Sequence, residues 1–103
     1  MANKNKNYPL YQTTVFPDFR IMSENVANRF PKRIAFSYRV HPQDKEVVTV
    51  TYPQARDRVR DLGTGMIALD ARDKKIAIIG ESTYEWAISY FALMSIGSVT
   101  VPI

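Results

Sequence analysis

The stretch "KIAIIGESTYEWAISYFALMSIGSVTVPI", Lys75 to Ile103, decides the fold of this chain. It contains an apolar strand, a corner at Gly80, an aromatic-rich helix, a second corner at Gly97 and another apolar strand. Apolar runs in both strands predict burial on both faces, which is typical of a parallel βαβ unit with a right-handed crossover. We therefore expect an α/β fold.

The first corner of this unit, "GESTYEW", raises the question of whether it binds a phosphate. Phosphate-binding turns need several glycines, and a P-loop also needs a lysine, whereas this corner has Gly80 alone and no lysine. Glu81 and Glu85 would repel a phosphate from the helix N-terminus. We interpret the segment as a structural corner in which Gly80 permits the turn and Ser82 forms a capping box with Glu85.

Two strands are expected upstream, "RIAFSYRV" at residues 33–40 and "EVVTVTY" at residues 46–52. The short polar loop "HPQDK" joins them, so an antiparallel hairpin is predicted. His41 opens that loop, and a lone histidine in a polar turn is interpreted as a surface residue rather than a ligand.

Helices are predicted on both sides of the hairpin. Pro17 and Asp18 suit a helix N-terminus, and Pro31 ends that first helix. Thr51 and Gln54 form a capping box that begins the second helix. Its apolar stripe comprises Tyr52, Ala55, Val59, Leu62, Met66 and Leu69.

Gly63 and Gly65 interrupt the second helix, and each costs about 1 kcal/mol relative to alanine. A cost of this kind within an apolar-striped helix indicates close approach to another element.

The amino-acid composition excludes several kinds of functional site. The chain has 103 residues, of which 46% are hydrophobic and 23% charged, as in an ordinary globular domain. It has no cysteine and one histidine, which excludes disulfides, cysteine nucleophiles and multi-histidine metal clusters. The net charge is +4, but basic and acidic residues are interspersed, which favours a mixed solvated surface over nucleic-acid binding. No signal peptide is visible, and we expect a cytoplasmic protein.

One segment imitates a membrane span, because Trp86 to Ile103 carries no charge. Gly97 and Ser98 break it, so a buried helix followed by a strand explains it better, and no transmembrane segment is expected. No catalytic constellation is visible either. The serines lack a neighbouring base, and a metal or acid/base pair of Glu81 and Glu85 is conceivable but unspecific.

Two longer stretches resemble a known family. "VTYPQARDRVRDLGTGMIAL" (residues 50–69) and "KKIAIIGESTYEWAISYFALMSIGSVTVPI" (residues 74–103) are similar to the first two signatures of the adenylate-forming (AMP-binding) enzymes. The family contains acyl-CoA synthetases, luciferases and the adenylation domains of peptide synthetases. The form "GESTYEW" is most similar to the long-chain fatty acyl-CoA synthetase branch.

The resemblance implies activation of a carboxylic acid with ATP and Mg to an acyl-adenylate, and then transfer to a thiol, often coenzyme A. The family's catalytic motifs are a Ser/Thr/Gly-rich loop ending in lysine, an adenine-binding aromatic segment, a ribose-binding aspartate and a C-terminal lysine. None is found in this sequence, so catalytic, cofactor-binding and metal residues are all expected to be none. The family residues present are expected to be scaffold: Thr51, Tyr52, Gly80, Ser82, Trp86, Gly97 and Pro102.

These observations predict an N-terminal arm at residues 1–15 and a partial N-terminal AMP-binding-type domain at residues 16–103, truncated at Ile103. The parent would be an ATP-dependent acyl-CoA synthetase that uses ATP, Mg and coenzyme A, while this segment alone would bind none of them and be inactive. The alternative is a non-catalytic interaction or regulatory module derived from the same fold. Expected partners are the remainder of the parent enzyme and a second copy at an exposed sheet edge, with no nucleic acid.

Overall fold

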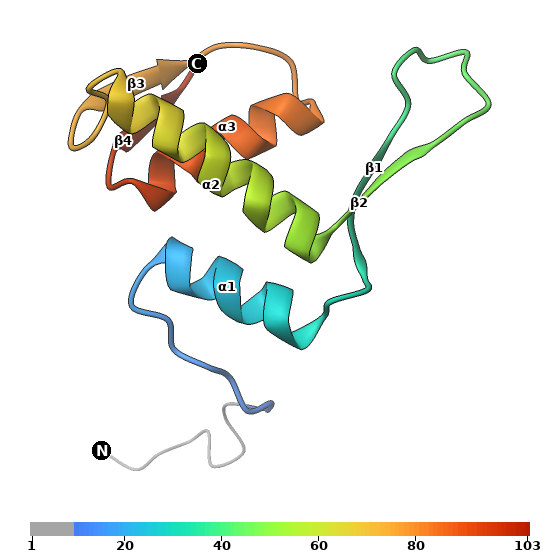
Figure 1. Cartoon of the computed structure of the whole chain (residues 1–103), viewed down its shortest axis with the longest axis horizontal. Helices are drawn as coiled ribbons and strands as arrows, with labels where there is room; N and C mark the ends of the chain where they lie inside the picture. The colour runs from blue at the N-terminus through green and yellow to red at the C-terminus, as the bar shows by residue number, and fades with distance from the viewer. Residues whose placement is uncertain (1–9) are drawn as a thin grey trace.

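The computed structural model describes residues 10–103, and the first nine residues of the predicted arm lie outside that range. Three helices lie close together, and the hairpin projects away from them (Figure 1). In chain order the elements are α1 (Phe19–Arg29), β1 (Ile34–Tyr38), β2 (Val48–Thr51), α2 (Tyr52–Ala68), β3 (Lys75–Ile78), α3 (Tyr84–Ser95) and β4 (Val99–Pro102).

The start of α1 is confirmed. Asp18 is the N-cap, and its Oδ1 accepts a hydrogen bond from the backbone amide of Ile21 at 2.8 Å. This bond satisfies one of the amides that a helix start leaves unpaired. The helix ends at Arg29, and Phe30 is the C-cap immediately before Pro31. A proline at that position disfavours helical backbone in the residue before it.

The antiparallel hairpin is also confirmed. Strands β1 and β2 pair with Ser37 opposite Thr49, and the register shifts between Ile34 and Phe36. Both strands are shorter than the apolar patterns predicted, because the residues nearest the turn do not pair. The turn is closed by a hydrogen bond from the His41 amide to the Asp44 carboxylate at 3.1 Å.

The capping box at the start of α2 forms as predicted. Thr51 Oγ1 accepts from the Gln54 amide at 3.3 Å, and Gln54 Oε1 accepts from the Thr51 amide at 2.9 Å. The predicted apolar stripe of α2 is wrong at two positions, because Leu62 is 37% exposed and Leu69 is 83% exposed. The stripe is therefore buried at its N-terminal and middle turns, where Ala55 and Val59 lie.

Only one of the two glycines of α2 marks a close approach. A Cβ on Gly63 would lie 3.2 Å from Ile96 Cγ2 and 3.6 Å from the Ala92 carbonyl oxygen, so α3 packs directly against this point. A Cβ on Gly65 would meet nothing within 4 Å, so the prediction of close contact is wrong there.

The βαβ unit forms as predicted and confirms the α/β class. Strands β3 and β4 are parallel, with Ile76 opposite Thr100, and α3 connects them. The connection from α3 to β4 turns at Gly97, whose φ of 81° lies in the left-handed region that favours glycine.

Burial of both faces of these strands is not observed. In β4, Val99 is 54% exposed and Val101 41%, and Ile79, which follows β3 directly, is 76% exposed. Among the described elements, α3 is the one that packs extensively on β3 and β4, so the opposite face of this pair faces solvent.

The core lies where α2, α3 and β2 meet (Figure 1). It is formed by Val50, Ala55, Val59, Ile88 and Ala92. Helix α1 adds Ala27, which is 2% exposed, and Phe19 of α1 stacks on Phe91 of α3 with ring centroids 4.9 Å apart.

Candidate functional site

The corner between β3 and α3 occupies the position at which α/β proteins commonly bind ligands. The C-terminal ends of the two parallel strands meet there, and the Ile103 amide donates to the Ile78 carbonyl at 3.1 Å. In open α/β sheets, ligands bind outside the carboxyl ends of the strands. The geometry of the residues between Ile78 and Tyr84 decides whether this corner can hold one.

A different residue caps α3 from the one that the sequence predicted. Thr83 is the N-cap, and its Oγ1 accepts from the Trp86 amide at 3.2 Å. The predicted capping box of Ser82 with Glu85 is therefore wrong. The Thr83 amide donates to the Glu81 carbonyl at 2.8 Å, and this tight turn leaves Ser82 outside the helix start.

The predicted role of Gly80 is also wrong. The φ of Gly80 does not lie in the left-handed region. Among the glycines of residues 10–103, Gly97 is the one that does. A Cβ on Gly80 would lie 3.7 Å from Trp86 Cδ1, which is an ordinary van der Waals contact. The corner therefore does not depend on the freedom of a glycine at this position.

These contacts do not fit a nucleotide phosphate. The Trp86 amide is already bound by Thr83, and Glu85 brings a negative charge to the first turn of α3, where an anionic ligand would bind. Glu81, two residues before the N-cap, adds another negative charge. The corner is a structural turn capped by Thr83.

We expect Thr83→Ala to destabilise the fold by about 1 kcal/mol, since it removes the cap hydrogen bond. Ser82→Ala is the matched control and should change stability by less than about 0.5 kcal/mol, because Ser82 is exposed and does not cap α3. Urea unfolding followed by circular dichroism measures both. A larger loss in Ser82→Ala than in Thr83→Ala would restore the capping box that the sequence suggested.

An aromatic cluster joins the hairpin to the start of α3. Tyr84 stacks on Tyr38 with ring centroids 5.0 Å apart, and Phe36 meets Tyr84 edge-on at 5.2 Å. A cavity of about 730 Å³ opens beside these rings. The rings of Phe36 and Tyr38 in β1 pack against the ring of Tyr84 in α3, and this packing holds β1 against the start of α3.

Burial within this cluster raises the pKa of Tyr84 above its ordinary value of 10.0, while Arg58 opposes the shift. Folding therefore favours the protonated phenol. The stability that this phenol contributes is fully present below its ordinary pKa and is lost as the pH rises through the raised value.

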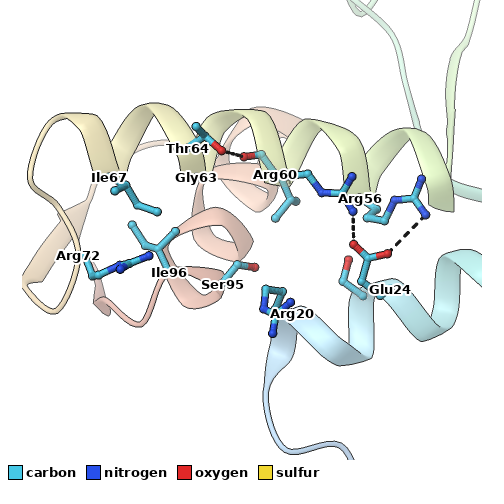
Figure 2. A pocket seen from close by; sticks show the side chains of 12 residues that line it. Arg20, Glu24, Arg56, Arg60, Gly63, Thr64, Ile67, Arg72, Ser95 and Ile96 are labelled. Carbon is cyan, nitrogen blue, oxygen red and sulfur yellow. Dashed lines mark hydrogen bonds and ion pairs between the residues drawn. The ribbon is translucent and has the colours of Figure 1, made fainter.

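A second cavity, of about 300 Å³, lies between α1, α2 and the C-terminal end of α3 (Figure 2). We call it the arginine pocket, because its charged lining residues are Arg20, Glu24, Arg56, Arg60 and Arg72. Its remaining lining residues are uncharged: Ser23, Val59, Gly63, Thr64, Ile67, Ser95 and Ile96.

Glu24 organises one side of the arginine pocket. Its carboxylate pairs with Arg60 through Oε1 and with Arg56 through Oε2, the latter at 3.6 Å (Figure 2). Arg56 also pairs with Asp57 at 3.0 Å. Glu24 of α1 is thus linked to Arg56 and Arg60 of α2, although ion pairs this exposed contribute only about 0–1 kcal/mol each to stability.

Interspersed charges favour a mixed solvated surface for these arginines, and only the spacing of two of them points to this pocket. Arg56 and Arg60 are four residues apart, which places them on one face of a helix. Their meeting with Glu24 depends on how α1 packs against α2, and local spacing does not predict that packing.

The other residues considered as sites are not brought together. His41 is exposed in the hairpin loop. Ser89 and Ser95 donate their hydroxyl hydrogens to backbone carbonyls one turn earlier, Glu85 at 2.7 Å and Phe91 at 2.8 Å. Within residues 10–103, no three acidic, histidine or cysteine side chains gather in a way that could hold a metal ion.

None of the helices between residues 10 and 103 combines the length and the apolarity that crossing a membrane requires.

Comparison with known proteins shows to which family the chain is similar. A family model described as AMP-binding enzyme matches residues 23–103. The long-chain-fatty-acid–CoA ligase FadD15 of Mycobacterium bovis is 38% identical over 55 residues, which cover 52% of this chain and 9% of the relative. FadD15 of Mycobacterium tuberculosis is 37% identical over 54 residues, with the same two coverages. The chain thus matches only a small part of the length of these relatives.

Solved structures agree in fold. The N-terminal subdomain of Klebsiella oxytoca NpsA superposes with a TM-score of 0.72 at 25% identity, covering 85% of this chain and 22% of that one. An artificially fused adenylation–PCP di-domain, NpsA-ThdA from the same organism, superposes with a TM-score of 0.67 at 25% identity. It covers 91% of this chain and 16% of that one.

Proposed function

The chain belongs to the AMP-binding enzyme family, and from this premise we propose that it is part of an ATP-dependent acid–thiol ligase. The whole protein would activate a long-chain fatty acid as its acyl-adenylate and transfer the acyl group to coenzyme A. The observation that carries this proposal is the 38% identity over 55 residues to a long-chain-fatty-acid–CoA ligase.

Residues 10–103 would serve as scaffold in that enzyme. The corner at the C-terminal ends of β3 and β4 is capped by Thr83 and flanked by two carboxylates, so it does not fit a triphosphate. Binding of ATP, Mg and coenzyme A is therefore proposed for parts of the enzyme beyond this segment. The exposed apolar residues of β3 and β4 would pack against those parts.

A second candidate comes from the solved structures, which are adenylation domains rather than CoA ligases. Their superposition at a TM-score of 0.72 supports an enzyme that activates a carboxylic acid for a carrier protein. We favour the CoA ligase because the 55 residues matched to FadD15 are 38% identical, whereas NpsA is 25% identical over 85% of this chain. Self-association through the exposed edge of β3 and β4 stays a prediction.

The acid and the thiol can be identified from the product. We expect the whole protein, supplied with ATP, Mg and coenzyme A, to form palmitoyl-CoA from palmitate, detected by mass spectrometry. Anthranilate, supplied in parallel, should give no thioester. Activation of anthranilate without transfer to coenzyme A would favour the adenylation-domain candidate. If neither acid is activated, nor any in a panel of other acids, the non-catalytic interaction module would become the better explanation.

A further inference from the structure

The arginine pocket carries a large excess of positive charge for its size. Four arginines and one glutamate line a cavity of about 300 Å³, an excess of three positive charges. The arginines come from α1, α2 and the loop after α2, so the fold itself brings them to one place (Figure 2). A mixed solvated surface would show both signs in comparable number.

Two of these arginines, Arg20 and Arg72, have guanidinium N–H groups without a partner among residues 10–103. Within residues 10–103, Arg56 and Arg60 take Glu24 as partner, whereas Arg20 and Arg72 take part in no ion pair or side-chain hydrogen bond. Both guanidinium groups line the same cavity (Figure 2). Arginine keeps its charge at all relevant pH values and presents several donors in a planar fork.

The end of α3 beside the pocket does not need these donors. The Leu93 carbonyl accepts from the Ser98 amide at 3.1 Å and from the Ile96 amide at 3.3 Å, and the Met94 carbonyl accepts from Gly97 at 3.3 Å. Since backbone amides already bind these carbonyls, capping of α3 does not account for the arginines.

Two of the three hydroxyl groups of the lining, those of Thr64 and Ser95, already donate to backbone carbonyls. Thr64 Oγ1 donates to the Arg60 carbonyl at 2.9 Å, and Ser95 Oγ donates to the Phe91 carbonyl at 2.8 Å. The guanidinium groups and the Ser23 hydroxyl are therefore the side-chain donors left at the cavity. The apolar side chains of the lining are Val59, Ile67 and Ile96.

We propose that the arginine pocket binds a phosphate group through the arginines that Glu24 leaves free. Guanidinium groups match phosphate oxygens in pairs of hydrogen bonds, and such charge-assisted bonds are the strong ones. A volume of about 300 Å³ is at the lower end of small-molecule sites, which suits inorganic phosphate or a short phosphorylated molecule. Such binding would tie α1 to α2 and to the loop before β3.

The test is a phosphate titration at constant ionic strength, followed by amide NMR of the chain. We expect saturable shifts at Arg72, Ser95 and Ile96. Arg72→Gln and Arg20→Gln should each weaken binding about tenfold, since each removes a charge-assisted pair. Lys45→Gln is the matched control, because it removes one positive charge from the exposed hairpin loop, and it should leave the affinity unchanged.

Glu24→Gln gives an effect of opposite sign. Removing the carboxylate frees Arg60, leaves Arg56 paired with Asp57 alone and lowers the negative charge of the pocket, so phosphate should bind several-fold more tightly. Phenyl phosphate distinguishes the two sources of the phosphate group. Tighter binding than inorganic phosphate would indicate a phosphorylated molecule whose apolar body uses Ile67 and Ile96, and equal binding would indicate free phosphate.

Three results would overturn the proposal. The first is a shift that grows without saturation, and the second is an equal weakening by Lys45→Gln. The third is a loss of stability on Arg72→Gln in phosphate-free buffer while phosphate leaves the stability of the unsubstituted chain unchanged, since it would mean that the arginine only supports the fold.

Discussion

Ile88→Ala is expected to lower the free energy of unfolding by about 2–5 kcal/mol, the range for large-to-small changes in a packed core. Ile88 is 4% exposed and belongs to the buried cluster with Val50, Val59 and Ala92. Removing its side chain leaves a cavity at the point where α2, α3 and β2 meet. A loss of this size is a large share of the about 5–15 kcal/mol that stabilises an ordinary domain.

Ile79→Ala is the matched control for this measurement. It deletes the same atoms at a position that is 76% exposed, on the solvent side of the corner after β3. Urea unfolding should show a change below about 0.5 kcal/mol. Similar losses for the two variants would mean that the core does not lie between α2 and α3.

Gly63→Leu is expected to destabilise the fold by about 1–3 kcal/mol, because it overpacks the contact between α2 and α3. A Cβ alone would lie 3.2 Å from Ile96 Cγ2, which is already tight, and the Ala92 carbonyl stands 3.6 Å away on the other helix. The longer leucine side chain would therefore push α3 away or adopt a strained rotamer.

The same substitution two residues later tests the assignment. Gly65→Leu meets nothing within 4 Å of its Cβ, so it should stabilise α2, by up to about 1 kcal/mol, through helix propensity. Trimming the partner in the double variant Gly63→Leu/Ile96→Ala should recover part of the loss measured for Gly63→Leu. The account of this contact fails if both glycine positions respond alike.

Features set by neighbouring residues could be predicted from the sequence. Asp18 caps α1, and Thr51 with Gln54 caps α2, because the partners of these bonds are three residues away along the chain. The parallel pairing of β3 and β4 was also predictable, since a helix of this length joins two apolar strands.

The cap of α3 shows where local reasoning fails. Ser82 and Thr83 are adjacent hydroxyl residues, and the pattern with Glu85 favoured Ser82. The tight turn that bonds the Thr83 amide to the Glu81 carbonyl places Thr83 at the helix start instead. The helix therefore begins one residue later than the pattern predicted, and the Thr83 hydroxyl caps α3 instead of the Ser82 hydroxyl.

The burial of a strand face and the contacts between side chains of different helices depend on elements far apart in sequence. The apolar run of β4 predicted burial on both faces, but Val99 and Val101, which share one face of the strand, are 54% and 41% exposed because helix packing covers only the other face. Likewise, the arginine pocket depends on how α1 packs against α2. The spacing of Arg56 and Arg60 could indicate a shared face but not Glu24 as the partner.

We propose that this segment is the scaffold of an acid-activating enzyme whose chemistry lies elsewhere in the protein. The most direct test is ATP–pyrophosphate exchange with palmitate, measured side by side for the whole protein and for the 103-residue chain. We predict acid-dependent exchange by the whole protein and none above background by the chain. Acid-dependent exchange by the purified chain alone would contradict the claim.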